Sequence, residues 1–262
     1  MLPSIVIGNT VINTYSLSLM IAILSGLLIA YKECKRLNLP VYHFPPTAFF
    51  GVVSGIIGAK IFEIIFYEWN DFIRSPLSSL LSGGGWMYYG AEIVGILGGV
   101  TYLVIRRIPV LSPLDVTAFA FMLAHAFGRV GCFLSGCCYG LETTCFTGVT
   151  FPGHHIKVHP TQLYESIPLL LGFTIFWFLR KKFVVPGTIF ASYLVFYSIL
   201  RFSVEFYRYD AYRFGFLSLS PSQYIAAVLF IAGLVAFPII LKSYSAQAKE
   251  EMATEEKKEY VI

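Results

Sequence analysis

The sequence predicts an all-α, polytopic membrane protein with about seven transmembrane helices. Hydrophobic residues make up 56% of the 262 residues and charged residues only 13%, whereas about a quarter of a soluble domain is charged. Mean hydropathy is +0.70. Apolar runs of about 20 residues recur, which is the length that crosses about 30 Å of hydrocarbon. The net charge of +4 is small and no dense basic stripe occurs, which argues against a nucleic-acid partner.

Seven apolar stretches correspond to the spans, each expected to be helical because a helix pairs its backbone groups within one segment. In chain order they cover residues 11–31, 46–67, 88–105, 113–134, 161–179, 186–206 and 223–241. The first lacks the charged start and cleavage site of a secretory signal, so we expect it to be retained. The third contains glycine at positions 90, 95, 98 and 99, which favours close packing against another helix.

The bias of lysine and arginine between the loops predicts the orientation. Basic residues follow the first, third, fifth and seventh spans: Lys32, Lys35, Arg36, Arg106, Arg107, Arg180, Lys181, Lys182 and Lys242. The opposite loops hold Arg74, Lys157, Arg208 and Arg213. We therefore expect the N-terminus outside and the C-terminus in the cytoplasm. Residues 1–245 form one membrane domain in this prediction, and residues 246–262 a polar cytoplasmic tail without chemistry, either a frayed helix or disordered.

Polar side chains gather at one depth, toward the outer ends of the predicted spans. They include Tyr15, Ser16, Lys60, Glu63, Tyr88, Tyr89, Glu92, His125, Arg129, Cys132, His159, Gln162, Tyr164, Glu165, Arg201, Glu205, Arg208 and Gln223. Ionisable groups inside a bilayer are costly and by default mark a functional site. A lattice of structural ion pairs is the alternative, with Lys60 and Glu63 at i,i+3 as an example. We favour a solvated cavity for an amphiphilic substrate.

Two arginines from different spans are candidates for binding an anion. Arg129 lies near the end of the fourth span among glycines, which let the backbone approach a ligand closely. Arg201 and Glu205 share one face of the sixth span, with Arg208 a turn further. This pair is either an intrahelical ion pair or an anion-binding arginine oriented by a carboxylate. Because arginine donates two parallel hydrogen bonds to phosphate, Arg129 and Arg201 together would suit a phospholipid head group.

Several motifs, in matching order, resemble those of one known family. Residues 128–140 read GRVGCFLSGCCYG, beside a family signature G-R-x-G-N-F-x-N-x-E-x-x-G. Residues 159–165 read HPTQLYE and residues 201–208 read RFSVEFYR, beside H-P-[ST]-Q-L-Y-E and R-x-x-x-E-F-F-R. Ser222 and Gln223 resemble a late S-x-[GS]-Q segment, and Tyr15 a first-span tyrosine. Over most of its length the chain thus resembles the prolipoprotein diacylglyceryl transferase family.

The resemblance implies a bacterial inner-membrane enzyme with its active site toward the outer face. Such an enzyme transfers the diacylglyceryl group of phosphatidylglycerol to the lipobox cysteine thiol of a preprolipoprotein, forming a thioether and releasing glycerol-1-phosphate. The attacking cysteine must be a thiolate, and the leaving phosphate needs charge stabilisation as its C–O bond breaks. No metal and no cofactor is implied. We expect a cavity that opens laterally to lipid, since both substrates arrive within the membrane.

Carried over position by position, the resemblance implies roles for individual residues. Arg129, Arg201 and Glu205 are expected to be catalytic. The expected substrate-binding or cavity-lining residues are Tyr15, Gly131, Cys132, Gly140, His159 and Gln162.

One departure from the family concerns the general base. The family commonly has a histidine in the third span, where this chain has Tyr89. We place Tyr89 among the catalytic residues, although a tyrosine of ordinary pKa, about 10, is a poor base at neutral pH. The other candidate bases are Glu92, His125 and Glu205.

A second departure concerns cysteine. Cys132, Cys137, Cys138 and Cys145 fall within fourteen residues, and the first two stand where the signature has asparagine and glutamate. They could ligate a metal, but C-x4-C-C-x6-C is not a standard zinc spacing. They could form a disulfide, for example through Cys145, because the outer face is oxidising. We favour small buried thiols that fill space beside Arg129, and hence no metal.

Two other functions stay open. Tyr89 in place of histidine is compatible with a related transferase that uses a different acceptor. A lipid-binding or transport protein could use the same polar cavity, although the two halves of the chain show no evident inverted repeat.

Overall fold

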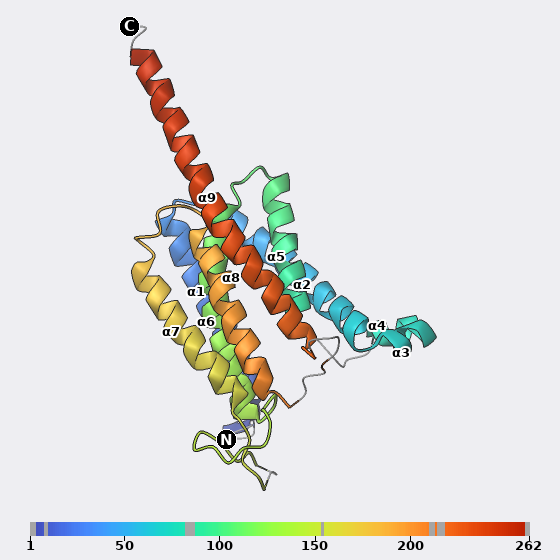
Figure 1. Cartoon of the computed structure of the whole chain (residues 1–262). Helices are drawn as coiled ribbons and strands as arrows, with labels where there is room; N and C mark the ends of the chain where they lie inside the picture. The colour runs from blue at the N-terminus through green and yellow to red at the C-terminus, as the bar shows by residue number, and fades with distance from the viewer. Residues whose placement is uncertain are drawn as a thin grey trace. The chain divides into compact units, whose positions relative to one another are not determined.

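Helices dominate the computed structural model, which describes residues 4–7, 10–81, 87–152, 155–209, 213 and 218–259 (Figure 1). Within those ranges, seven helical segments are long and apolar enough to cross a membrane. The prediction of an all-α, seven-span protein is thereby confirmed. The orientation of the termini stays a prediction.

The elements follow the predicted spans closely. In chain order they are β1 (Ser4–Ile7), β2 (Thr10–Asn13), α1 (Thr14–Arg36), η1 (Val41–His43), α2 (Phe44–Phe66), α3 (Trp69–Arg74), α4 (Pro76–Leu81), α5 (Tyr88–Ile105), α6 (Leu111–Ser135), α7 (Thr161–Leu179), α8 (Thr188–Val204), η2 (Glu205–Tyr207) and α9 (Pro221–Glu259). The predicted spans 88–105 and 161–179 coincide with α5 and α7. Helix α9 continues through most of the predicted tail, whose residues 260–262 lie outside the described ranges.

The start of the first span was predicted three residues too early. Residues 10–13 form β2, which pairs antiparallel with β1. The Asn13 side chain accepts a hydrogen bond from the Tyr15 N–H at 2.8 Å, as an N-cap residue does. Helix α1 therefore begins at Thr14. Hydropathy alone could not place this boundary because the β2 residues Val11 and Ile12 are as apolar as the helix that follows.

The chain divides into two compact units. The first comprises Met1–Ala30 and Leu114–Ile262, and the second comprises Tyr31–Pro113. The first unit therefore contains most of α1 together with nearly all of α6 and the whole of α7, α8 and α9. The second contains the end of α1 and the helices α2 to α5.

The core of the first unit centres on one face of α6. Ala118, Phe119, Met122 and Ala126 recur every three to four residues and are fully buried, as expected of the inward stripe of a helix. The Phe119 ring meets the Trp177 ring of α7 edge-on, with the ring centres 5.7 Å apart. At one end of α6, Asp115 accepts hydrogen bonds from the Gly187 and Phe190 N–H groups, at 2.7 and 2.8 Å. It thereby satisfies backbone donors at the start of α8.

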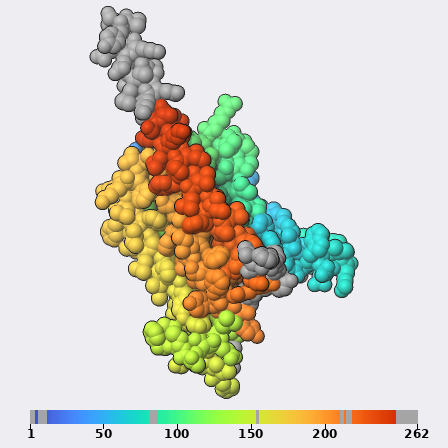
Figure 2. Space-filling view, viewed as in Figure 1, coloured from blue at the N-terminus to red at the C-terminus, as the bar shows by residue number. Residues whose placement is uncertain are grey.

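The segment between α6 and α7, called the connecting segment below, lies at one end of the first unit, where Figure 2 shows it in yellow-green. Isolated antiparallel bridges hold it together: Glu142 with Val158, and Val149 with Val158. A further bridge joins Gly140 to Arg208, just beyond η2. The segment thus links the end of α6, the start of α7 and the end of α8, which is where the polar residues of this unit lie.

The second unit is held together by a glycine interface between α2 and α5. A Cβ added to Gly58 would overlap the Gly90 carbonyl, and one added to Gly90 would overlap the Gly58 carbonyl. The predicted role of glycine in the third span, close helix packing, is confirmed. Lys60, which the sequence offered with Glu63 as an example of a structural ion pair, binds Glu68 Oε2 through its Nζ at 3.0 Å and also interacts electrostatically with Glu63.

Candidate active site

The most buried ion pairs of the first unit meet at Glu165 of α7. Its Oε2 accepts a hydrogen bond from Arg129 Nε of α6 at 2.8 Å, and its Oε1 accepts one from Arg201 Nη1 of α8 at 2.6 Å. The Glu165 side chain is 1% exposed. One carboxylate therefore joins the two arginines that the sequence predicted to share a site.

A second carboxylate, Glu205, extends the network. Its Oε2 lies 2.7 Å from Arg201 Nη2 and 3.9 Å from Arg208 Nε, while its Oε1 accepts a hydrogen bond from Ser220 Oγ at 2.7 Å. We call Arg129, Glu165, Arg201, Glu205 and Arg208 the arginine–glutamate cluster. Three arginines against two carboxylates leave it with one net positive charge.

Pairing makes this burial tolerable. Removing an ion from water costs several kcal/mol unless partners offset the loss. Here Glu165 has a guanidinium on each oxygen, and Arg201 has a carboxylate on each terminal nitrogen. His125 Nε2 of α6 lies 3.4 Å from Glu165 Oε2, and its ring meets the Tyr197 ring at 5.4 Å. The arrangement can present a net positive charge to an anion without leaving a carboxylate unpaired.

The start of α9 is built onto this cluster. Ser220 and Gln223 form a capping box, in which the Gln223 N–H donates to Ser220 Oγ and the Ser220 N–H donates to Gln223 Oε1. Ser222 Oγ accepts a hydrogen bond from Arg201 Nη2 at 3.5 Å. The late motif at Ser222 and Gln223 thus fixes the entry of α9 beside Arg201.

Backbone contacts explain Gly140 and His159. The Gly140 N–H donates to the His159 carbonyl at 2.8 Å, and an added Cβ would overlap the Tyr207 carbonyl. His159 Nδ1 lies 3.0 Å from the Tyr164 hydroxyl, and its ring packs on Tyr207. These two residues join the connecting segment to α7 and η2.

Tyr15 and Gly131 lie at the crossing of α1 and α6. A Cβ added to Gly131 would approach Ser18 Cβ to 2.7 Å and the Tyr15 ring to 3.5 Å. The missing side chain therefore lets the two helices approach closely. Tyr15 stays 41% exposed, so its ring is accessible close to Arg129 and the three cysteines.

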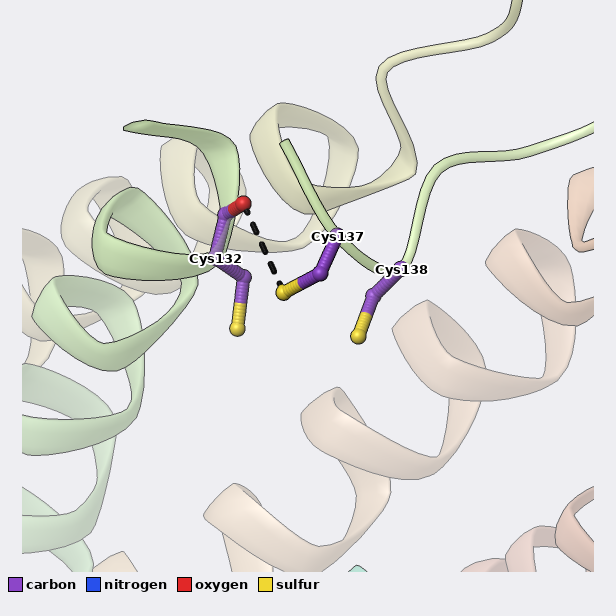
Figure 3. Close-up of side chains that lie close together, drawn as sticks. All are labelled: Cys132, Cys137 and Cys138. Atoms are coloured by element: carbon purple, nitrogen blue, oxygen red, sulfur yellow. Dashed lines mark hydrogen bonds between the residues drawn. The ribbon is translucent and has the colours of Figure 1, made fainter. Parts of the chain in front are cut away.

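The turn after α6 brings three cysteines together. Gly136 has φ +75°, its N–H donates to the Phe133 carbonyl, and the Cys137 N–H donates to the Cys132 carbonyl at 3.1 Å. These bonds define a Schellman motif, which sets the residue after the glycine against the one five positions earlier. Cys138 follows at φ +63°. The Sγ atoms of Cys132, Cys137 and Cys138 lie within 4.8 Å of one another and point toward a common space (Figure 3).

Two buried side chains of α7 hold this turn. Gln162 Nε2 donates to the Cys137 carbonyl at 2.6 Å, and Thr161 Oγ1 donates to the Cys138 carbonyl at 2.8 Å. Both side chains belong to residues that are 1% exposed. Gln162, a predicted site residue, therefore supports the turn that brings together Cys132, Cys137 and Cys138. We call this turn the cysteine turn.

The remaining cysteines lie elsewhere. All five are free thiols in the structure. Cys145 is exposed in the connecting segment, with its Sγ 3.4 Å from Thr147 Oγ1, and Cys34 is buried near the end of α1. The expectation that the thiols near Arg129 are buried was wrong: Cys137 and Cys138 are exposed and Cys132 is half-buried, because they lie in and beside the turn that ends α6.

Tyr89 belongs to the second unit. It is 2% exposed at the start of α5, where its ring meets that of Tyr88. Its predicted catalytic role stays a prediction.

Sequence reasoning assigned no role to Glu165, the residue on which the ion pairs converge. A signal was present, because Gln162 and Glu165 stand at i,i+3 on one face of a predicted span. Two polar residues on one face of an apolar helix predict a buried polar contact. Which arginines they would meet depended on the packing of α6 and α8.

Fold and site together define a helical membrane protein with a buried, net-positive cluster at one end of a bundle. The family model for prolipoprotein diacylglyceryl transferase matches residues 4–239. The chain belongs to this family.

Named relatives agree with that assignment. A phosphatidylglycerol–prolipoprotein diacylglyceryl transferase of Clostridium tetani is 35% identical over 86% of this chain and 92% of its own length. The second such enzyme of Clostridium perfringens is 38% identical over 72% of this chain and 75% of its own length. That of Clostridioides difficile is 32% identical over 90% of this chain and 94% of its own.

Proposed function

We propose that this protein transfers the diacylglyceryl group of phosphatidylglycerol to the lipobox cysteine of a preprolipoprotein in the bacterial inner membrane. The names of the relatives support both substrates. Seven apolar helices support a site reached from within the bilayer. In this proposal the arginine–glutamate cluster faces the outer side.

The observation that carries the proposal is the ion-pair network at Glu165. A phosphate diester carries one negative charge, and the cluster carries one net positive charge. Arg129 and Arg201 hold the phosphate by charge-assisted hydrogen bonds. Glu165 and Glu205 fix the planes of the two guanidinium groups and keep them charged in an apolar environment.

The transfer is a displacement at the glyceryl carbon. The thiolate sulfur of the acceptor forms a bond to that carbon while the carbon–oxygen bond to phosphate breaks, and glycerol-1-phosphate leaves with the electron pair. Negative charge grows on the leaving oxygen, so arginines already in place lower the barrier.

The chemistry requires a thiolate, and the carboxylates are poorly suited to produce it. Both oxygens of Glu205 are engaged, one by Ser220 and the other by Arg201. Both oxygens of Glu165 contact arginine. His125 beside Glu165 and Tyr89 of the second unit remain the proposed groups for proton transfer.

The test is mass spectrometry of a lipobox peptide incubated with the full chain in phosphatidylglycerol nanodiscs. The wild type should add one diacylglyceryl mass. Arg201→Ala should lower the rate by about 100-fold or more, the size of effect that one lost transition-state donor has. Arg201→Lys keeps the charge but loses the two parallel donors of the guanidinium group, so its rate should lie between those of the wild type and Arg201→Ala.

Arg74→Ala is the matched control, because Arg74 is an exposed arginine of α3. It should transfer at the wild-type rate. Thermal melting of each variant separates loss of chemistry from loss of fold. Transfer by folded Arg201→Ala at the wild-type rate would contradict the phosphate-binding role, and a folded wild type without any product would contradict the transferase function.

A further inference from the structure

The cysteine turn has the donor set and the spacing of a thiolate metal site. A zinc ion bound by sulfur at about 2.3 Å in tetrahedral geometry holds its sulfurs about 3.8 Å apart. The three Sγ atoms already lie within 4.8 Å of one another, which is within about 1 Å of that separation. The linear spacing of the cysteines is not a standard zinc spacing. The Schellman motif, however, brings together residues five positions apart, and so it places Cys137 against Cys132.

The turn is held in place before any ion arrives. Backbone hydrogen bonds fix Gly136 and Cys137 on the end of α6, and Thr161 and Gln162 of α7 hold the carbonyls of Cys137 and Cys138. A preformed site of this kind needs no rearrangement of backbone to bind. Cys137 and Cys138 are exposed, whereas Cys132 is half-buried, so one side of the site is open.

We propose that Cys132, Cys137 and Cys138 bind one zinc ion through three thiolates, and that the open fourth position takes the thiol of the acceptor cysteine. A three-ligand site with one open position is the arrangement of catalytic zinc. The second half of this proposal rests on the proposed function.

The location fits this role. Cys132 follows Arg129 by three residues on α6, and Gln162, which holds the turn, precedes Glu165 by three residues on α7. Both helices thus carry the cysteine turn and the arginine–glutamate cluster about one helical turn apart, roughly 5 Å along the axis. A thiol bound at the zinc would lie beside a phosphate held by Arg129.

Zinc would supply the thiolate. A thiol that coordinates a metal ion is deprotonated, so the acceptor releases its proton to water as its sulfur binds. That sulfur then forms the bond to the glyceryl carbon while the carbon–oxygen bond breaks and the electron pair leaves with the phosphate. The neutral thioether is a weaker ligand than a thiolate and leaves the zinc. This route does not depend on a base at Tyr89.

The first experiment measures metal content and coordination in the full chain in nanodiscs. Elemental analysis should give about one zinc per chain for the wild type. Replacement by cobalt should give the intense thiolate-to-cobalt absorption and the visible bands of a tetrahedral site. Cys137→Ser and Cys138→Ser should lose both, and Gln162→Ala should weaken zinc binding by about 10- to 100-fold, as loss of a supporting hydrogen bond does.

Cys145→Ser is the control, because Cys145 lies outside the turn, and it should keep the metal and the activity. Each serine variant is checked for its melting temperature. Absence of zinc and of the cobalt spectrum from the folded wild type would overturn the site. A disulfide among the three cysteines in zinc-loaded protein, detected by mass spectrometry after alkylation, would overturn it as well.

The second experiment tests the open position with the cobalt protein and a lipobox peptide. The cysteine peptide should shift the thiolate-to-cobalt absorption, whereas a peptide with serine in place of that cysteine should not. Cys137→Ser and Cys138→Ser should lower transfer by about 100-fold. An unchanged spectrum would overturn the acceptor role and leave the metal site. A shifted spectrum without product from the zinc protein would contradict the proposed transferase, not the site.

Discussion

At the scale of single residues, Glu165 decides most of the site. Its carboxylate is the counter-ion of two arginines on two other helices, and no water is required to satisfy it. A charge buried in this way stabilises only while its partners are present, because an unpaired buried charge costs more than the pair gains. Glu165 is therefore the residue whose neutral replacement should have the largest effect on the fold.

We expect Glu165→Gln to lower the free energy of unfolding by about 3–5 kcal/mol, because it leaves two buried guanidinium groups short of a counter-ion. The measurement is denaturation in detergent micelles followed by circular dichroism. Glu142→Gln, an exposed carboxylate of the connecting segment, should change stability by less than about 0.5 kcal/mol. Equal stability of the two variants would show that the cluster does not hold the helices together.

The thiol of Cys145 provides a prediction on pH. Hydrogen bonds from Thr147 lower the pKa of Cys145 below its ordinary value. Thr147 Oγ1 also lies 2.8 Å from the Tyr164 hydroxyl, which lies 3.0 Å from His159 Nδ1. A lower pKa leaves more thiolate at a given pH. The pH at which maleimide modifies Cys145 at half its maximal rate should therefore lie below the midpoint of an ordinary thiol, about 8.5.

Thr147→Val removes the donating hydroxyl and should move that midpoint upward toward the ordinary value. Mass spectrometry of the modified peptide, over a pH series in the Cys34→Ser background, gives the rate. A midpoint that is the same with threonine and valine would show that this hydrogen bond does not set the pKa.

At the scale of elements, small residues determine which helices pack. Gly58 of α2 and Gly90 of α5 place backbone against backbone, whereas Gly131 of α6 lies against the Ser18 and Tyr15 side chains of α1. In lipid, the hydrophobic effect does not drive two apolar helices together. Their association depends instead on the many weak packing contacts that close approach allows. One added methyl group at such a crossing should therefore weaken the packing contacts along both helices.

We expect Gly58→Ala to destabilise the protein by about 1–3 kcal/mol, the usual cost of overpacking. The measurement is the melting temperature in micelles. Gly128→Ala is the matched control, since an added Cβ there meets no atom within 4 Å. Alanine is the better helix former, so this variant should gain about 0.5–1 kcal/mol. Stabilisation by both substitutions would contradict the close packing of α2 against α5.

At the scale of the whole molecule, the distribution of charge is expected to determine orientation. Basic residues concentrate in the loops after the first, third, fifth and seventh spans, and such loops stay in the cytoplasm. The connecting segment that carries Cys145 would then face outside, together with the cysteine turn and the arginine–glutamate cluster. This is also the side on which an exported acceptor would arrive.

We expect a membrane-impermeant maleimide to label Cys145 in intact cells and to spare a cysteine placed at Lys181. After the cells are opened, both positions should react. The background variant carries serine at the other native cysteines. Labelling of Lys181→Cys but not of Cys145 in intact cells would reverse the predicted orientation and place the site on the cytoplasmic side.

The sequence by itself determined the number of spans and the approximate bounds of most of them, and it predicted that Arg129 and Arg201 lie close together, because hydropathy and helical period can be read along the chain. Tertiary structure alone decided that Glu165 joins the arginines and that Lys60 pairs with Glu68, because these partners lie on different elements or follow a helix end. It also decided where the cysteines lie relative to one another. Their linear spacing is not a standard zinc spacing, whereas one left-handed glycine after α6 folds the chain back and brings three thiols together.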